Sequence, residues 1–226
     1  MSGRTTEYEV VKEFGFQVLL GLPEDQTLPM RKTHYDHIKI YAEDVPLGTQ
    51  RLITEDIIEE LDEIPKPILR HVSAIVLSPF SCAMDQYLRI RNDMEGKTLA
   101  TVIPNTGMII IFELPVDISE VKQRMEQEQT ILHEIGHIID KKRGLLEGNT
   151  YFSKGDKWNQ ARNRDNENRI NQCLYNGYVS EHAGASRSVL EDFAGSFVEF
   201  VKRPNSFKQQ YPNRVIILEG LNVYDA

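Results

Sequence analysis

Residues 132–140 have the sequence LHEIGHIID, and this stretch restricts the fold more than any other part of the chain. Its two histidines, His133 and His137, are four residues apart, so on an α-helix their imidazoles lie one turn apart on one face. Two imidazoles in that arrangement can bind one metal ion, and Glu134 can take a proton from a water at that ion. The HExxH pattern therefore predicts a helix that carries a hydrolytic zinc site.

The residues around the motif have a helical pattern. Asp117 and Glu120 have the spacing of a capping box, and apolar residues follow at intervals of three, four and seven: Ile118, Val121, Met125, Leu132, Ile135 and Ile139. Gly144 comes after three basic residues and predicts the helix end. We therefore expect one helix over residues 118–143.

A five-residue pattern also arises by chance, so a pair of surface histidines on an amphipathic helix is the alternative. His133 and His137 fall on a strip beside the apolar stripe, which favours metal ligands. Asp140 is one turn past His137. It either accepts a hydrogen bond from a liganding imidazole or is an ordinary solvated aspartate.

A hydrolytic zinc normally takes three protein ligands and leaves a fourth position for water. Residues 188–201 form a second amphipathic helical pattern, with Pro204 beyond its end. Glu191, in its first turn, is a candidate third ligand, and Asp192 is the alternative. Ser188 and Glu191 also have capping-box spacing, which would explain this glutamate without a metal.

Composition narrows the classes of protein that fit. The 226 residues are 40% hydrophobic and 27% charged, as in an ordinary soluble protein, and they suffice for one domain. The net charge of −8 argues against a nucleic-acid partner. No apolar run approaches the roughly 18 residues of a membrane span, and the first residues lack a signal peptide. We expect a soluble, cytoplasmic protein, or one secreted by a leaderless route or with a trimmed leader. Two cysteines, Cys82 and Cys173, predict no disulfide framework.

The first half of the chain is expected to form a small sheet. β-branched and aromatic residues predict strands over 7–20, 35–42, 71–77, 98–103 and 108–112. The last two form a hairpin pattern, in which the first arm is a candidate edge strand for an extended peptide, or an edge without a ligand. Thr54 is expected to cap a helix that ends near Leu61. His34 and His37 fall on opposite faces of a strand, which argues against a metal site there.

Residues 151–187 are polar and predict a loop with one or two helical turns. The order of elements predicts an α+β fold: a single domain over 1–226, with a sheet part over about 1–115 and the active helix and a C-terminal helical part over about 116–226.

The sequence HEIGH, followed some fifty residues later by GYVSEHAG…EDFAGSF, resembles the lethal-factor-like zinc metallopeptidases. The likeness is greatest to the small bacterial zinc-binding peptidases with a VSxYA…EDFAE signature, and it covers roughly residues 130–211. It implies a zincin-like fold with a small mixed sheet packed on the active helix. It also implies one zinc ion, with Glu191 as third ligand after His133 and His137.

The resemblance further implies a zinc metalloendopeptidase with a protein or peptide substrate. Zinc-bound water would be activated by Glu134, and a tyrosine of the VSxYA segment would point at the reacting carbonyl. His182 stands at that tyrosine position, with Tyr178 as the alternative donor, and Gly195 replaces the second glutamate of EDFAE. Two other functions stay open: a zincin-like module that binds zinc and a partner without efficient proteolysis, and a narrow-specificity effector or toxin protease.

Overall fold

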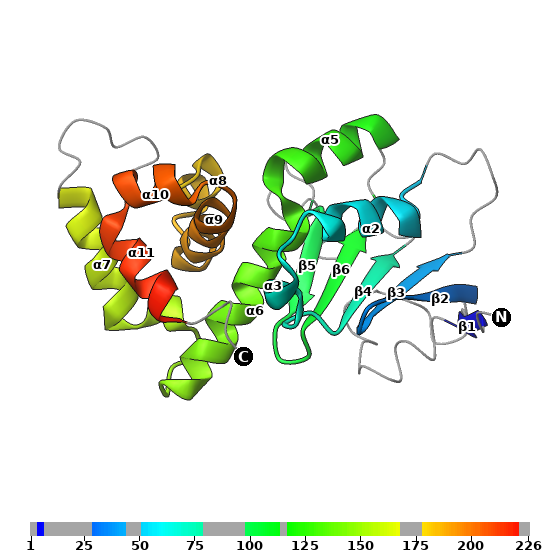
Figure 1. Cartoon of the computed structure of the whole chain (residues 1–226), viewed down its shortest axis with the longest axis horizontal. Coiled ribbons are helices and arrows are strands. Elements are labelled where there is room, and N and C mark those ends of the chain that lie inside the picture. Colours follow the sequence, from blue (N-terminus) through cyan, green and yellow to red (C-terminus); the bar gives the residue numbers. More distant parts are fainter. Residues whose placement is uncertain are drawn as a thin grey trace, which may run out of the picture. The chain divides into compact units, whose positions relative to one another are not determined.

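The computed structural model describes residues 4–6, 29–43, 51–78, 98–113, 117–167 and 178–221. They belong to two compact units, residues 1–64 with 72–131, and residues 65–71 with 132–226. The first unit contains a mixed sheet and the second is helical (Figure 1). The α+β class is therefore confirmed, whereas the single domain expected over 1–226 stays a prediction.

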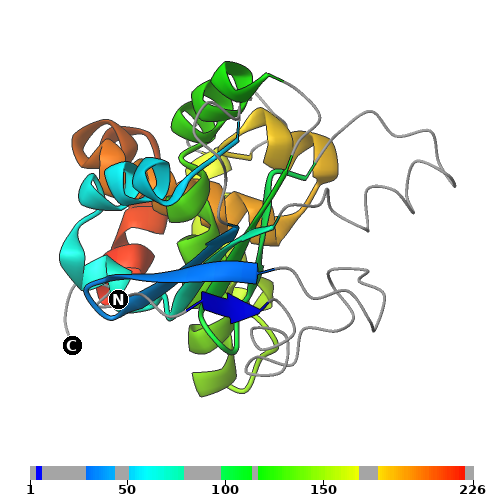
Figure 2. The same ribbon diagram turned by 90° about the vertical axis from the view of Figure 1, so that its right-hand side faces the viewer.

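The sheet of the first unit has six strands in the order β1-β2-β3-β4-β6-β5. Strands β3, β4 and β6 pair in parallel, and the other neighbours are antiparallel. The edge formed by β1 and β2 faces the viewer in Figure 2. The bounds are β1 Arg4–Thr6, β2 Pro29–Tyr35, β3 Ile38–Glu43, β4 Ala74–Ser78, β5 Ala100–Ile103 and β6 Met108–Phe112.

The predicted hairpin of 98–103 and 108–112 is confirmed, because β5 pairs with β6 in antiparallel register from Ala100–Ile111 to Ile103–Met108. All five residues of β6 are buried, and those of β5 are half-buried. This difference follows from position, since β6 lies between two strands and β5 lies at the edge of the sheet. The predicted strand over 71–77 begins later, at Ala74.

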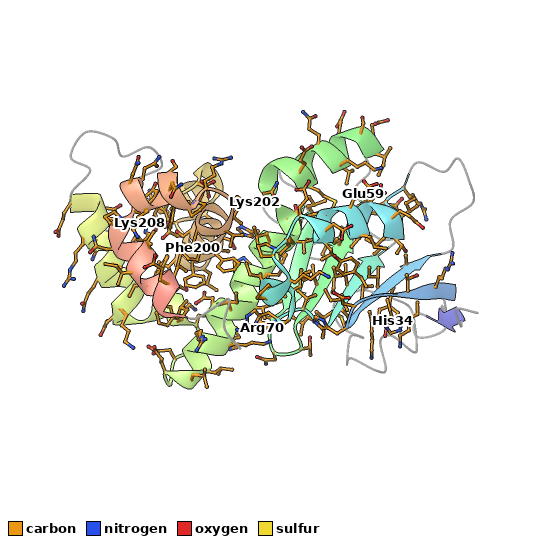
Figure 3. The ribbon with its side chains drawn as sticks, viewed as in Figure 1. His34, Glu59, Arg70, Phe200, Lys202 and Lys208 are labelled. Atoms are coloured by element: carbon orange, nitrogen blue, oxygen red, sulfur yellow. The ribbon has the colours of Figure 1, made fainter. Side chains whose placement is uncertain are left out.

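The predicted strand over 35–42 is wrong at its start. Tyr35 ends β2, and the chain turns through Asp36 and His37 before β3. Asp36 has a φ of 50°, the left-handed region that aspartate tolerates in tight turns. His34 and His37 are both exposed and do not belong to a metal-ligand cluster among the described residues (Figure 3 labels His34). The predicted strand over 7–20 lies outside the described residues.

Helix α2, Thr54–Asp62, ends next to the predicted Leu61 and buries Ile57 and Leu61. The cap differs, because Ile53 rather than Thr54 is the N-cap residue, and the Ile53 N–H donates to the Asp56 carboxylate at 2.9 Å. The side chain of Asp56 thus satisfies a backbone donor at the helix start from inside the first turn.

The helix predicted over 118–143 is two helices. Asp117 caps the first, α5, Ile118–Glu128, by accepting from the Ser119 N–H at 2.8 Å. Gln129 then adopts a left-handed conformation with a φ of 49°, and α6 follows over Thr130–Leu146. A single residue with positive φ breaks the hydrogen-bond ladder without changing the apolar spacing, so periodicity could not reveal it.

The second unit holds α3, α6 from Leu132 onward and the helices that follow α6. Their bounds are α3 Lys66–Leu69, η1 Phe152–Lys154, α7 Asp156–Glu167, α8 Glu181–Ser186, α9 Val189–Lys202, α10 Pro204–Gln210 and α11 Pro212–Gly220. Its core contains Trp158 and Phe193, whose ring centroids are 4.8 Å apart. No described helix has the length and hydrophobicity needed to cross a membrane.

The loop predicted over 151–187 contains a helix of three turns, α7. Its buried residues are Trp158, Ala161 and Asp165, spaced three and four apart. One of the three is an aspartate, so the stripe that faces the core has too little hydrophobicity to reveal a helix.

Candidate metal centre

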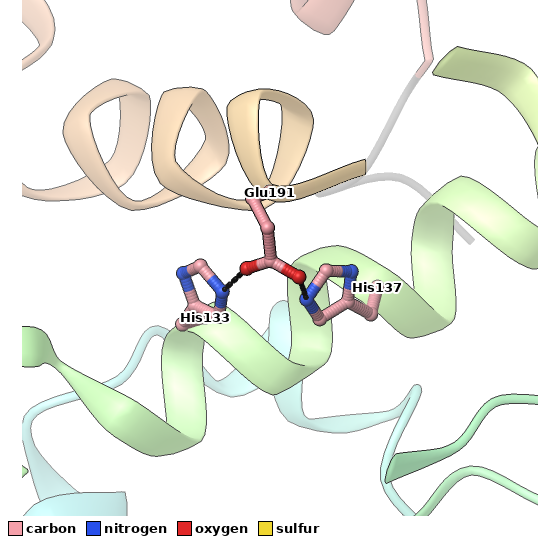
Figure 4. Close-up of side chains that lie close together, drawn as sticks. All are labelled: His133, His137 and Glu191. Atoms are coloured by element: carbon pink, nitrogen blue, oxygen red, sulfur yellow. Dashed lines mark hydrogen bonds and ion pairs between the residues drawn. The ribbon is translucent and has the colours of Figure 1, made fainter. Parts of the chain in front are cut away.

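Two helices of the second unit contribute the site. Helix α6 carries His133, Glu134 and His137, and α9 carries Glu191. Figure 4 shows the Glu191 side chain extending from α9 toward both histidines. The three ligand candidates thus come together although His137 and Glu191 are 54 residues apart in the sequence.

The crossing of these helices depends on Gly136. A Cβ atom on Gly136 would lie 2.9 Å from the Cα of Ala194 on α9, closer than real Cβ atoms approach. The backbones of α6 and α9 therefore touch at a point between the two histidines and one turn after Glu191. This contact sets how near the carboxylate comes to the imidazoles.

The carboxylate of Glu191 bridges the two histidines. Its Oε2 is 3.0 Å from Nε2 of His133, and its Oε1 is 3.5 Å from Nε2 of His137 (Figure 4). The imidazole rings meet edge to face, with centroids 4.9 Å apart. One potential ligand atom from each residue lies within 4.8 Å of the others, so the cluster could hold a metal ion.

The electrostatics of the cluster favour a cation. Burial alone lowers the pKa of His137, but its hydrogen bond with Glu191 and the negative charges of Glu134, Glu191 and Asp140 raise that pKa above the usual histidine value. Three carboxylates around two imidazoles make a negative potential, which a bound cation would neutralise. Glu134 is itself buried, with 8% of its surface exposed.

Ser188 caps the start of α9 as the sequence predicts, but the Glu191 side chain does not take part in the cap. The Ser188 hydroxyl accepts from the Glu191 N–H at 3.3 Å, which caps the helix. The Glu191 carboxylate points to the histidines instead of back to the cap. Its alternative, Asp192, is fully buried and accepts a hydrogen bond from the Val179 N–H at 2.9 Å.

Asp140 is not a solvated aspartate. It is fully buried and accepts hydrogen bonds from the Ser153 N–H and hydroxyl, both at 2.7 Å. Burial raises the pKa of Asp140, and the two bonds from Ser153 oppose that rise. Asp140 therefore anchors the turn of η1 against α6, one helical turn past His137.

The two candidate donors for the reacting carbonyl lie on neighbouring segments. Tyr178 is half-buried, and the guanidinium of Arg162 stacks on its ring at 4.6 Å from the centroid. His182 falls in α8, which Ser180 caps through the Ala183 N–H at 3.2 Å. The side chain of His182 lies outside the described residues, so its role stays a prediction.

Gly195 faces the segment that contains these donors. A Cβ atom on Gly195 would make ordinary contacts, 3.6 Å from the Ser180 hydroxyl oxygen and 3.7 Å from Val179. The Cβ atom of a glutamate, the residue expected here from the EDFAE signature, would lie beside the Ser180 hydroxyl. A methyl group would therefore fit at Gly195 without moving α9 or this segment.

Sequence reasoning missed a buried charged cluster of Asp165, Asp192 and Arg214. All three side chains have 0% exposure. Arg214 Nη2 is 3.6 Å from Asp192, and Arg214 Nε is 3.9 Å from Asp165. The signal in the sequence was weak: Asp165 continues the helical spacing of Trp158 and Ala161, the pattern of a residue that faces a core.

Comparison with known proteins adds no relative, since no family model matches the chain and no curated protein matches it.

Proposed function

We propose that this protein is a zinc metalloendopeptidase with a zincin-like fold. The observation that carries the proposal is the convergence of His133, His137 and Glu191, with Glu134 buried next to the first histidine. Two imidazoles and one carboxylate are the ligand set of many hydrolytic zinc sites.

Two of the distances between candidate ligand atoms support a zinc ion at this position. Ligands at about 2.1 Å from a tetrahedral ion lie about 3.4 Å from each other. The distances from the Glu191 oxygens to His133 Nε2 and His137 Nε2 are 3.0 and 3.5 Å. One ligand atom from each of the three residues lies within 4.8 Å of the others, so the side chains would adjust around one ion.

His133, His137 and Glu191 would hold the zinc ion, which would act as a Lewis acid toward a carbonyl and lower the pKa of water to near neutral. Glu134 takes the proton of the attacking water and passes it to the leaving amine. Its position beside His133 brings it to the water without making it a ligand. His182 or Tyr178 donates a hydrogen bond to the oxyanion that develops, an interaction worth roughly 3 kcal/mol when well placed.

The presence of Glu134 favours an enzyme over a zinc-binding module that only holds a partner. A structural zinc site closes its fourth position with another ligand and needs no acid there. Burial of an ionisable side chain is costly unless its neighbours compensate for it. The negative charge of Glu134 acts on His137, which agrees with a group directed at the site.

The test compares Glu134→Gln with wild type in zinc content and in cleavage of a peptide library. We expect Glu134→Gln to keep about one zinc per chain and to lose cleavage, because the amide cannot accept the proton. Glu147→Gln is the matched control, since Glu147 is exposed just beyond the end of α6 and pairs with Lys157 at 2.8 Å. Cleavage by Glu134→Gln at the wild-type rate would contradict the mechanism. Zinc binding by a wild type that cleaves nothing would instead support the partner-binding module.

A further inference from the structure

Asp192 occupies the position next to Glu191 on α9, and successive helical residues point about 100° apart. Glu191 extends to the histidines, whereas Asp192 is fully buried on another side of the helix. Its Oδ1 accepts a hydrogen bond from the Val179 N–H at 2.9 Å. One turn of α9 therefore carries both the candidate ligand and an anchor for the segment over 178–180.

Arg214 contacts the other carboxylate oxygen of Asp192. Its Nη2 lies 3.6 Å from Asp192 Oδ2, and its guanidinium lies 4.6 Å from the ring centroid of Tyr211. Both charges have 0% exposure, so water does not screen their attraction. Burial raises the pKa of Asp192, and the charge of Arg214 and the Val179 N–H act against that rise.

Asp165 contacts both the backbone and the guanidinium of Arg214. Its two oxygens accept from the N–H groups of Asn213 at 2.9 Å and Arg214 at 3.0 Å, and from the Asn213 side-chain amide at 2.8 Å. These donors belong to the first turn of α11, whose N–H groups have no partner within the helix. Asp165 thus caps α11, while Asp192 contacts Val179 in the segment over 178–180.

The anchored segment and the helix that follows it contain the two candidate oxyanion donors, Tyr178 and His182. Tyr178 directly precedes Val179, and Ser180 starts α8, the helix that contains His182. Both candidate donors to the oxyanion are therefore attached within three residues of the Asp192 hydrogen bond. Gly195, one turn beyond Asp192, lies close to Val179 and Ser180 of this segment.

We propose that Asp192 is a positioning residue, which links the ligand helix to the segment carrying the oxyanion donor through its bond to Val179. This inference rests on the proposed function. Because Asp192 acts on the donor segment whereas the Glu191 carboxylate contacts the two histidines, loss of the anchor should affect turnover more than zinc binding. A misplacement of about 1 Å can cost roughly 100-fold in rate.

The experiment compares Asp192→Ala, Asp192→Asn and the control Asp165→Asn in zinc per chain, kcat and KM. Asp192→Ala should keep zinc and KM and lower kcat roughly 10- to 100-fold. Asp192→Asn should recover most of kcat, because its amide oxygen can still accept from Val179. Asp165→Asn disturbs the same buried cluster from the other end and should lower thermal stability without changing kcat.

A second measurement does not depend on activity. Amide hydrogen exchange of zinc-loaded protein should show that Val179 loses protection in Asp192→Ala and keeps it in Asp192→Asn and Asp165→Asn. This result would uphold the anchor even if the wild type cleaves no peptide and the proposed function fails. An unchanged Val179 amide in Asp192→Ala, or a fall in kcat that only matches a fall in bound zinc, would overturn the inference.

Discussion

The sequence offers two explanations for Glu191, a helix cap and a contact with the histidines. In the structure, the backbone of Glu191 takes part in the cap and its side chain makes the contact. The N–H of Glu191 is capped by Ser188, while the carboxylate reaches His133 and His137. A capping box would have turned that carboxylate back toward the helix start. The choice between these arrangements depends on α6 lying beside α9, which is a tertiary contact.

Replacement of Glu191 should remove most of the affinity for zinc. Loss of an outer partner of a ligand already costs roughly 10- to 100-fold in metal affinity, so we expect at least about 100-fold for Glu191→Ala. Competition with a chromogenic chelator measures the affinity. Glu199→Ala, on the same helix but paired with Arg203, is the control and should bind zinc as the wild type does. Equal affinities for both variants would remove Glu191 from the site.

Tyr35 offers a test in the first unit, away from the metal centre. Its hydroxyl donates to Asp62 at 2.6 Å, and this hydrogen bond, with burial and the charges of Asp62 and Asp36, raises the pKa of Tyr35 to about 12. The pKa of Tyr35 in the folded protein is above the ordinary tyrosine value of 10.0. The stabilisation that this interaction contributes is therefore present below pH 10.0 and is lost as the pH rises toward about 12.

Ultraviolet titration of phenolate measures this shift. We expect Asp62→Asn to lower the late-titrating pKa toward 10.0, because the amide carries no charge to hold the proton. The folded state must persist over the range, which circular dichroism checks. An unchanged titration curve in Asp62→Asn would show that Asp62 does not hold the Tyr35 proton.

Between elements, the contact of α6 and α9 is the critical feature. Alanine is favoured over glycine by about 1 kcal/mol inside an isolated helix. At Gly136 the added methyl group would lie 2.9 Å from the Ala194 Cα, so α9 would have to move. The same displacement would carry Glu191 away from the histidines.

Gly136→Ala should therefore lower the free energy of unfolding by roughly 1–3 kcal/mol, as overpacked cores do, and weaken zinc binding. Denaturant unfolding and zinc titration measure the two effects. Gly220→Ala is the control, because a Cβ atom there meets nothing within 4 Å. A Gly136→Ala variant as stable as wild type, with full zinc affinity, would show that α9 does not depend on this close approach.

At the scale of the whole molecule, the single tryptophan allows the unfolding of the second unit to be followed separately from that of the first. Trp158 is fully buried in the second unit, which also holds the candidate metal centre. Its fluorescence therefore reports the unfolding of that unit alone. The aromatic residues around it, including Phe193 of α9, connect its environment to the helix of Glu191.

Removal of zinc should shift the Trp158 transition to lower temperature. An ion at 100 times its dissociation constant stabilises the folded state by about 2.7 kcal/mol, and a chelator removes that contribution. The measurement is fluorescence-monitored melting with and without chelator. Glu191→Ala should show little further change with chelator, and an unchanged wild-type transition would contradict a metal site in this unit.

Local patterns were sufficient for features that depend on neighbouring residues. The β5–β6 hairpin, the Asp117 and Ser188 caps and the four-residue spacing of His133 and His137 follow from turn chemistry and helical period. Periodicity could not reveal the break at Gln129, since a left-handed residue leaves the apolar spacing intact. It also missed α7, because a buried aspartate interrupts its apolar stripe.

The remaining features depend on residues far apart in the chain. Glu191 rather than Asp192 joins the histidines because α9 crosses α6 at Gly136 and Ala194. Asp192 instead faces Val179 and Arg214. Adjacent residues on a helix point in different directions, and only the packing partner of each face determines which carboxylate meets a metal and which meets an arginine.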